Sequence, residues 1–109
     1  MTRSFTQSFA RYSDLEGQTI FVSGGASGIG AAIVSLFAGQ GATVHFVDID
    51  GAAGEALADK LNTLYGKKPI FSVCDVTDTA ALSKAIEAAG AANGKLKALV
   101  NNAARDLRV

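Results

Sequence analysis

Four short apolar runs divide the chain at regular intervals. Each run is continuous rather than alternating with polar residues, which is typical of strands that helices cover on both faces of a sheet. The sequence therefore predicts four buried strands, over residues 19–22, 43–47, 70–73 and 98–100.

The segments between these runs have apolar residues at helical spacing. They predict three amphipathic helices, with Ile29, Ile33, Leu36 and Phe37 in the first, Leu57, Leu61 and Leu64 in the second, and Leu82, Ile86 and Ala89 in the third. A glycine ends each helix, and a left-handed cap is expected at the first of them, Gly41. Asp50 suits the N-cap of the second helix, and Thr77 or Asp78 that of the third.

Strands and helices alternate as βαβαβαβ. Because crossovers between parallel strands are right-handed, this alternation predicts an α/β fold, the first half of a doubly wound, Rossmann-like parallel sheet with strand order 3-2-1-4. Its switch point lies between the first and fourth strands. We expect a polar N-terminal arm over residues 1–16 and a dinucleotide-binding half-domain over residues 17–109.

A glycine-rich loop, Gly24-x-x-x-Gly28-x-Gly30, joins the first strand to the first helix. Such a turn directs unpaired backbone N–H groups and the positive end of the helix dipole toward one point, where a phosphate is the natural ligand. The common G-x-G-x-x-G fingerprint does not fit this loop, because Ile33 stands where its third glycine is required.

Asp48 ends the second strand, eighteen residues after Gly30, where dinucleotide-binding folds place the acid that binds the ribose hydroxyls of NAD. The alternative is a loop carboxylate or a helix cap, a role that suits Asp50 better. Ser27 and Ile49 offer no basic group to a 2′-phosphate. A carboxylate about 5 Å from a phosphate charge repels it by about 3 kcal/mol at an effective dielectric constant of about 20, so we expect roughly a hundredfold preference for NAD over NADP.

Two further strand ends carry residues that suit a nucleotide. Asp75 can accept a hydrogen bond from the adenine amino group while Val76 packs on the ring, although Asp75 is also a candidate helix cap. Asn101 and Asn102 follow the fourth strand, where their amides can bridge neighbouring backbone and hold the loop on which a cofactor lies.

In order and spacing, these four motifs resemble the short-chain dehydrogenase/reductase family over about residues 15–106. The resemblance implies an NAD-dependent oxidoreductase acting on an alcohol or a ketone, and residues 101–106 are similar to some sugar and polyol dehydrogenases. It implies cofactor-binding roles for Gly24, Ser27, Gly28, Ile29 and Gly30 at the pyrophosphate, Asp48 and Ile49 at the adenosine ribose, Asp75 and Val76 at the adenine, and Asn102, Ala103 and Ala104 near the inner ribose. Ser23 and Ala104 depart from the family pattern, which has threonine and glycine there.

The family's catalytic groups, a Ser and a Tyr-x-x-x-Lys pair, follow the asparagine motif and have no match here. Tyr12 is followed four residues later by Glu16, and Tyr65 by Pro69. No catalytic residue is therefore assigned, and we expect a truncated chain that is inactive alone. A non-catalytic nucleotide-binding module, or one half of a split enzyme, is the alternative, whereas residues 101–104 disfavour another Rossmann-like protein such as a methyltransferase.

Composition narrows the partners and the compartment. Ten basic and ten acidic side chains do not favour nucleic acid, and the apolar residues, 49% of the 109, are too interrupted for a membrane span. A single cysteine and a single histidine disfavour a disulfide or a metal site, and with no apolar leader they favour a cytoplasmic protein. An unpaired edge on the fourth strand predicts a homo-oligomer or self-association, with NAD stabilising the fold.

Overall fold

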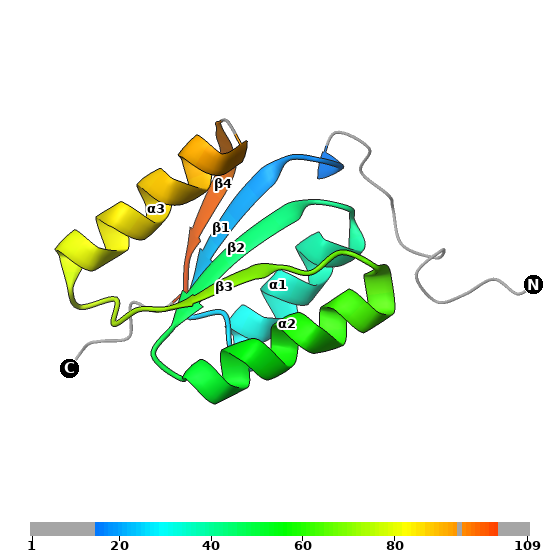
Figure 1. The fold of residues 1–109 in the computed structure, drawn as a ribbon, viewed down its shortest axis with the longest axis horizontal. Coiled ribbons are helices and arrows are strands. Elements are labelled where there is room, and N and C mark those ends of the chain that lie inside the picture. Colours follow the sequence, from blue (N-terminus) through cyan, green and yellow to red (C-terminus); the bar gives the residue numbers. More distant parts are fainter. Residues whose placement is uncertain (1–14, 94, 103–109) are drawn as a thin grey trace, which may run out of the picture.

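The computed structural model describes residues 15–93 and 95–102. Most of the predicted N-terminal arm, Gly94, Ala103 and Ala104 lie outside these residues. Within them, strands and helices alternate along the chain in the predicted order (Figure 1): β1 Thr19–Ser23, α1 Gly28–Gly39, β2 Thr43–Asp48, α2 Gly51–Tyr65, β3 Ile70–Val73, α3 Thr79–Asn93 and β4 Leu96–Asn101.

The strands form one parallel sheet of order β3-β2-β1-β4, which confirms the predicted topology. Helices α1 and α2 cover one face of the sheet and α3 covers the other (Figure 1). Strand β1 therefore lies in the middle, paired on both sides, and its carboxyl end meets the point where the strand order reverses.

Two hydrophobic clusters hold the layers together. Ile20 and Val22 of β1 pack with Phe46, Val34 and other buried residues on the α1 and α2 side. Phe21, which points the other way, packs with a second cluster beneath α3. All five residues of β1 are buried, so the continuous apolar run reflects a strand covered on both faces.

The ends of the helices follow the expected capping chemistry. Asp50 accepts a hydrogen bond from the Ala53 N–H at the start of α2, and Gly66 ends that helix with a φ of 74°. Gly41 has a φ of 85°, as predicted. Of the two candidate caps for α3, Asp78 fills the position, because its carboxylate accepts from the Ala81 N–H at 3.1 Å.

Strand β4 differs from its prediction in length. It begins at Leu96, two residues before the apolar run, and extends to Asn101. Its pairing with β1 is irregular between Thr19 and Ile20, whose partners are Leu96 and Ala98, so Lys97 is the extra residue of a bulge. A lysine in a bulge interrupts the apolar pattern, which is why the start of the strand predicted from the sequence is two residues too late.

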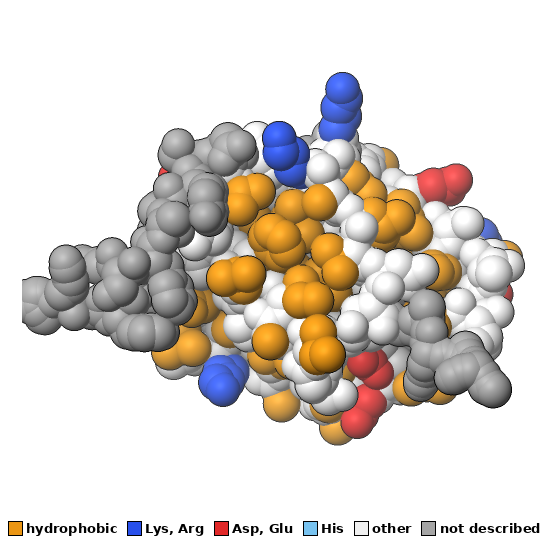
Figure 2. All heavy atoms as spheres, turned by 180° about the vertical axis from the view of Figure 1, so that it is seen from behind, with side chains coloured by type: hydrophobic (Ala, Val, Ile, Leu, Met, Phe, Trp, Pro, Cys, Tyr) orange, Lys and Arg blue, Asp and Glu red, His pale blue; other side chains and the backbone are white. Residues whose placement is uncertain are grey.

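Strand β4 is an edge of the sheet, since it pairs only with β1 among the described residues. Its apolar residues are only partly covered, and Leu99 is 52% exposed. Figure 2 views the molecule from behind Figure 1, the side of β4, and shows hydrophobic side chains gathered across that face. Self-association through this edge stays a prediction.

Two helix glycines give a matched test of this packing. A Cβ on Gly54 of α2 would overlap the ring of Phe71, whereas a Cβ on Gly90 of α3 would meet nothing within 4 Å. Gly54→Ala should lower the free energy of unfolding by about 1–3 kcal/mol through overpacking. Gly90→Ala should raise it by about 0.5–1 kcal/mol, because alanine restricts the unfolded chain and favours helix. Urea denaturation measures both, and equal stability of the two variants would contradict this packing.

Candidate functional site

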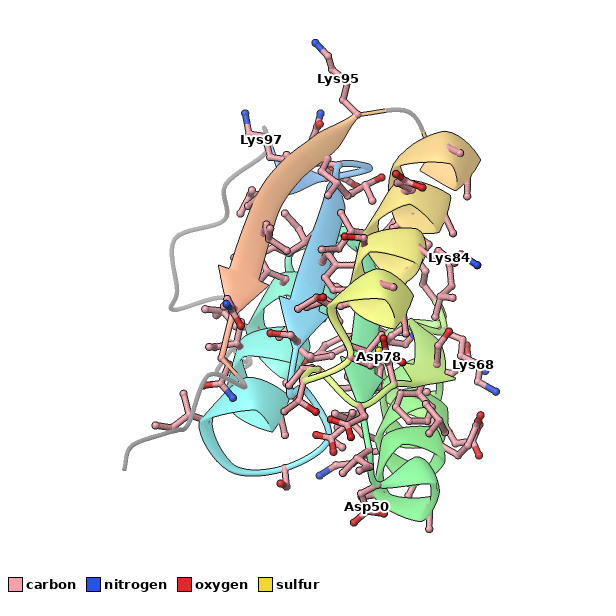
Figure 3. All side chains as sticks on the ribbon, turned by 90° about the vertical axis from the view of Figure 1, so that its left-hand side faces the viewer. Asp50, Lys68, Asp78, Lys84, Lys95 and Lys97 are labelled. Atoms are coloured by element: carbon pink, nitrogen blue, oxygen red, sulfur yellow. The ribbon has the colours of Figure 1, made fainter. Side chains whose placement is uncertain are left out.

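The carboxyl ends of the strands bring most of the predicted site residues to one end of the sheet. The glycine-rich loop follows β1, Asp48 and Ile49 lie at the end of β2, Asp75 and Val76 follow β3, and Asn102 follows β4. Figure 3 shows Asp50 and Asp78 toward this end of the molecule and Lys95 and Lys97 at the opposite end. The two predicted residues Ala103 and Ala104 lie outside the described residues.

Gly30 lets the first turn of α1 lie directly against the end of β1. A Cβ at this position would overlap the carbonyl oxygen of Gly24 and would lie 2.8 Å from Nδ2 of Asn102. That amide donates to the same Gly24 oxygen at 3.1 Å. Helix, loop and the end of β4 thus converge on one carbonyl group, and only a residue without a side chain fits between them.

The first half of the loop is bound to the end of β2. The N–H groups of Gly24 and Gly25 both donate to the Val47 carbonyl, at 2.8 and 3.1 Å. The next N–H, that of Ala26, donates to Oδ2 of Asp48 at 3.0 Å. Three consecutive backbone donors are therefore satisfied within the protein and face β2.

The second half of the loop leaves its donors open. Ser27 is the N-cap of α1, with an extended backbone (φ −152°, ψ 167°), and its side chain makes no capping bond. The N–H groups of Gly28, Ile29 and Gly30 have no acceptor within the helix, because an α-helix leaves its first donors unpaired. The Ile29 side chain is 73% exposed. Within the part of the chain that the structure describes, this helix start presents unpaired donors and the positive end of the helix dipole to an anion.

Asp48 is half-buried between two loops. Its Oδ1 accepts from the Asp50 N–H at 3.0 Å, while Oδ2 accepts from Ala26. An ionised carboxylate offers about four acceptor positions, so each oxygen can accept one bond more. Ile49, beside it, is 69% exposed.

Asp75 is exposed, and Thr77 fixes its orientation. Its Oδ1 accepts from both the side-chain hydroxyl and the N–H of Thr77, at 2.7 and 3.0 Å. These bonds, the hydroxyl first, hold the pKa of the Asp75 carboxyl below its ordinary value. Val76 packs against the cluster beneath α3, and Cys74 is a buried residue of that cluster. Burial, then the nearby charges of Asp78 and Asp75, raises the pKa of the Cys74 thiol.

Both asparagines join the strand ends, but only Asn102 bridges to backbone as predicted, since Asn101 bonds a side chain. The Ser23 hydroxyl, at the end of β1, donates to Oδ1 of Asn101 at 2.9 Å. With the bond from Asn102 to Gly24, this joins the carboxyl ends of β1 and β4 at two successive residues.

Sequence reasoning did not identify three groups that shape this site: the Ala26 N–H, the Val47 carbonyl and Thr77. The Thr77 contact could have been found, because Asp-x-Thr after a strand is typical of a turn in which the acid binds the residue two positions later. The other two are backbone groups, whose partners no residue type reveals.

Two other kinds of site find no support in residues 15–93 and 95–102. No group of three or more His, Cys, Asp or Glu side chains is placed to hold a metal ion. In the same part of the chain, no helix is both long and apolar enough to cross a membrane.

Known proteins match most of this chain in sequence. A family profile described as short chain dehydrogenase matches residues 18–108. The protein named "Probable galactose dehydrogenase" of Rhizobium meliloti is 43% identical over 99 residues, which are 91% of this chain and 39% of that protein. A D-threitol dehydrogenase of Mycolicibacterium smegmatis is 43% identical over 82% of this chain and 34% of its own length. The chain thus spans between a third and two fifths of these relatives.

Solved structures agree with the sequence relatives. A short-chain dehydrogenase/reductase variant from Serratia marcescens superposes with a TM-score of 0.78 at 40% identity, over 85% of this chain and 38% of that one. An NADPH-bound short-chain oxidoreductase from Pseudomonas aeruginosa has a TM-score of 0.74 at 37% identity, over 81% of this chain and 35% of that one. The profile match over most of the chain, the sheet order and the strand-end motifs agree: the chain belongs to the short-chain dehydrogenase family of oxidoreductases, which bind nicotinamide cofactors.

Proposed function

We propose that residues 17–109 form the NAD-binding part of a short-chain dehydrogenase that acts on an alcohol or a ketone. The observation that carries the proposal is the start of α1, whose first N–H groups have no acceptor within the helix. Because Gly30 has no side chain, this first turn can lie directly against the Gly24 carbonyl. A pyrophosphate at this helix start would accept hydrogen bonds from the N–H groups of residues 28–30.

The remaining strand ends supply the adenosine contacts in this proposal. Asp48 has acceptor capacity left for the ribose hydroxyls after binding its two backbone donors, and the exposed Ile49 flanks that position. Asp75 would accept from the adenine amino group through Oδ2, because both of its hydrogen bonds within the described residues end on Oδ1. Val76 would pack on the ring, and residues 102–104 would border the inner ribose.

The charge distribution favours NAD over NADP. Four carboxylates follow the strands at this end of the sheet: Asp48, Asp50, Asp75 and Asp78. Lysines 95 and 97 lie at the opposite end (Figure 3), and no Lys or Arg occurs in residues 24–30 or 48–51. A 2′-phosphate on the adenosine ribose would therefore meet repulsion without a compensating cation from these two segments. The NADPH-bound neighbour shows that family membership alone does not decide this choice.

The relatives suggest the substrate class, a sugar or a polyol, since two of them are named for galactose and D-threitol. In the 109 residues, neither tyrosine has a lysine four positions later, so the family's acid/base pair has no counterpart here. We propose accordingly that these residues bind the nucleotide without turnover.

Calorimetric titration with NAD and NADP tests the proposal. The wild-type chain should bind NAD roughly a hundredfold more tightly, because Asp48 repels the 2′-phosphate. Asp48→Ala should narrow that preference at least about tenfold, because it removes both this repulsion and the acceptor for the ribose hydroxyls. Asp78→Asn, which removes the same charge and keeps a capping side chain, should narrow it less. Equal affinities of the wild type for both nucleotides would contradict the proposal.

The pH dependence of Asp75 tests whether Thr77 fixes the carboxylate that we propose for the adenine amino group. Thr77→Val removes the hydroxyl donor and keeps the N–H, so the pKa of Asp75 should rise toward its ordinary value. Because the folded pKa is depressed, these bonds stabilise the fold fully above the ordinary carboxyl pKa, and that contribution disappears as pH falls through the folded pKa. The variant should therefore be less stable than the wild type at neutral pH, and this difference in stability should disappear in acid.

A carboxyl-detected NMR titration measures this pKa directly. Thr63→Val is the matched control, because that hydroxyl bonds a backbone carbonyl on the outer side of α2 and should leave Asp75 unaffected. An unchanged Asp75 midpoint in Thr77→Val would show that the hydroxyl does not hold the carboxylate.

A further inference from the structure

We infer that Asp48 has a second role, as the positioning residue of the glycine-rich loop. Its carboxylate fastens Ala26 to the end of β2, and so holds the N–H groups of residues 28–30 in place for a diphosphate before any nucleotide arrives. This inference rests on the proposed function for the phosphate site, and adds to the ribose contact a second role based on the bond between Asp48 and Ala26.

The bond from Ala26 to Asp48 completes a row of three backbone N–H groups bound to the end of β2. The N–H groups of Gly24 and Gly25 reach the Val47 carbonyl, but that oxygen already accepts two bonds. The next donor, on Ala26, has the Asp48 side chain as its acceptor. Ala26 is only 8% exposed, so water has little access to replace the carboxylate. Removing the carboxylate therefore leaves a buried donor unsatisfied, and the loop must move to relieve it.

Ala26 lies directly before the residues that begin helix α1. Ser27 follows it with an extended backbone and no side-chain cap, and Gly28 then begins α1 with a φ of 58°. Ala26 is the last residue of the loop whose N–H is bound to β2. The direction in which the chain leaves that anchor sets where the open donors of α1 point, since they begin two residues later.

The Asp48 carboxylate is itself held in place by two hydrogen bonds. Oδ1 accepts from the Asp50 N–H while Oδ2 accepts from Ala26, so donors from two loops define its plane. Cys74 donates its N–H to the Asp48 carbonyl at 3.0 Å, which ties the same residue to the end of β3. A side chain held in this way can orient a neighbouring loop, because its own freedom is already lost.

Charge and geometry predict opposite effects on phosphate affinity when the Asp48 carboxylate is lost. A carboxylate beside an anion site repels a phosphate, so if charge were all that mattered, Asp48→Asn would bind phosphate more tightly. If Asp48 positions the loop, the Asp48→Asn variant should bind phosphate less tightly than the wild type. An amide offers one acceptor oxygen where the carboxylate offers two. A single substitution intended to admit NADP would then loosen the site for both nucleotides.

The experiment compares Asp48→Asn and Asp48→Ala with the control Asp50→Asn. The control removes the same charge two residues away, and asparagine keeps the N-cap of α2. Amide hydrogen exchange of the nucleotide-free chain is followed at Ala26, with the β1 amides as a measure of global stability. Inorganic pyrophosphate, which has no ribose, is then titrated while the amide signals of residues 28–30 are recorded by NMR.

We expect Ala26 exchange to accelerate about tenfold in Asp48→Asn and further in Asp48→Ala, with β1 amides and Asp50→Asn unchanged. Pyrophosphate affinity should fall at least about threefold in Asp48→Asn and stay equal or rise in Asp50→Asn. Unchanged Ala26 exchange in both Asp48 variants, or pyrophosphate binding by Asp48→Asn that equals or exceeds that of the wild type, would overturn the inference. A wild type that binds no pyrophosphate would instead contradict the proposed phosphate site, and the exchange arm would still decide the role of Asp48.

Discussion

The site depends on the close approach of helix α1 to the carboxyl end of β1. The carbonyl of Gly24 occupies the space that any side chain at position 30 would need, and Asn102 donates to that carbonyl from β4. This contact brings the first turn of the helix, the loop and two strand ends within hydrogen-bonding distance. Asp48 bonds Ala26, which lies two residues before the first N–H groups of α1.

The layers around this contact explain why it holds. Strand β1 is buried on both faces, by α1 and α2 on one side and α3 on the other (Figure 1). Its neighbours β2 and β4 then deliver Asp48 and the two asparagines to the same end. Carboxylates gather where the strands end and lysines where β4 begins, so one end of the sheet is acidic while the helix start within it attracts anions. That combination suits a ligand with a phosphate in the middle and hydroxyl and amino donors beside it.

Much of this architecture could be predicted from the sequence, because it is encoded in repeated patterns. Four apolar runs with helical segments between them define the parallel order, and Asp50, Gly41 and Gly66 mark helix ends with local chemistry. The start of β4 could not be predicted, because Lys97 lies in a bulge and interrupts the pattern. The bond from Ala26 to Asp48 joins residues 22 positions apart through a backbone N–H, which has no signature in the sequence. The clash at Gly30 depends on how closely the helix packs, and sequence spacing only hints at it.

The central claim is that the close approach at Gly30 creates the nucleotide site, and Gly30→Ala tests it most directly. The measurement is the dissociation constant for NAD of the wild type and this variant, with circular dichroism to confirm the fold and Gly90→Ala as a control without steric conflict. The account predicts that Gly30→Ala keeps its secondary structure and binds NAD at least about tenfold more weakly, because the helix start must move away from Gly24. Wild-type affinity for NAD in a folded Gly30→Ala chain would contradict it.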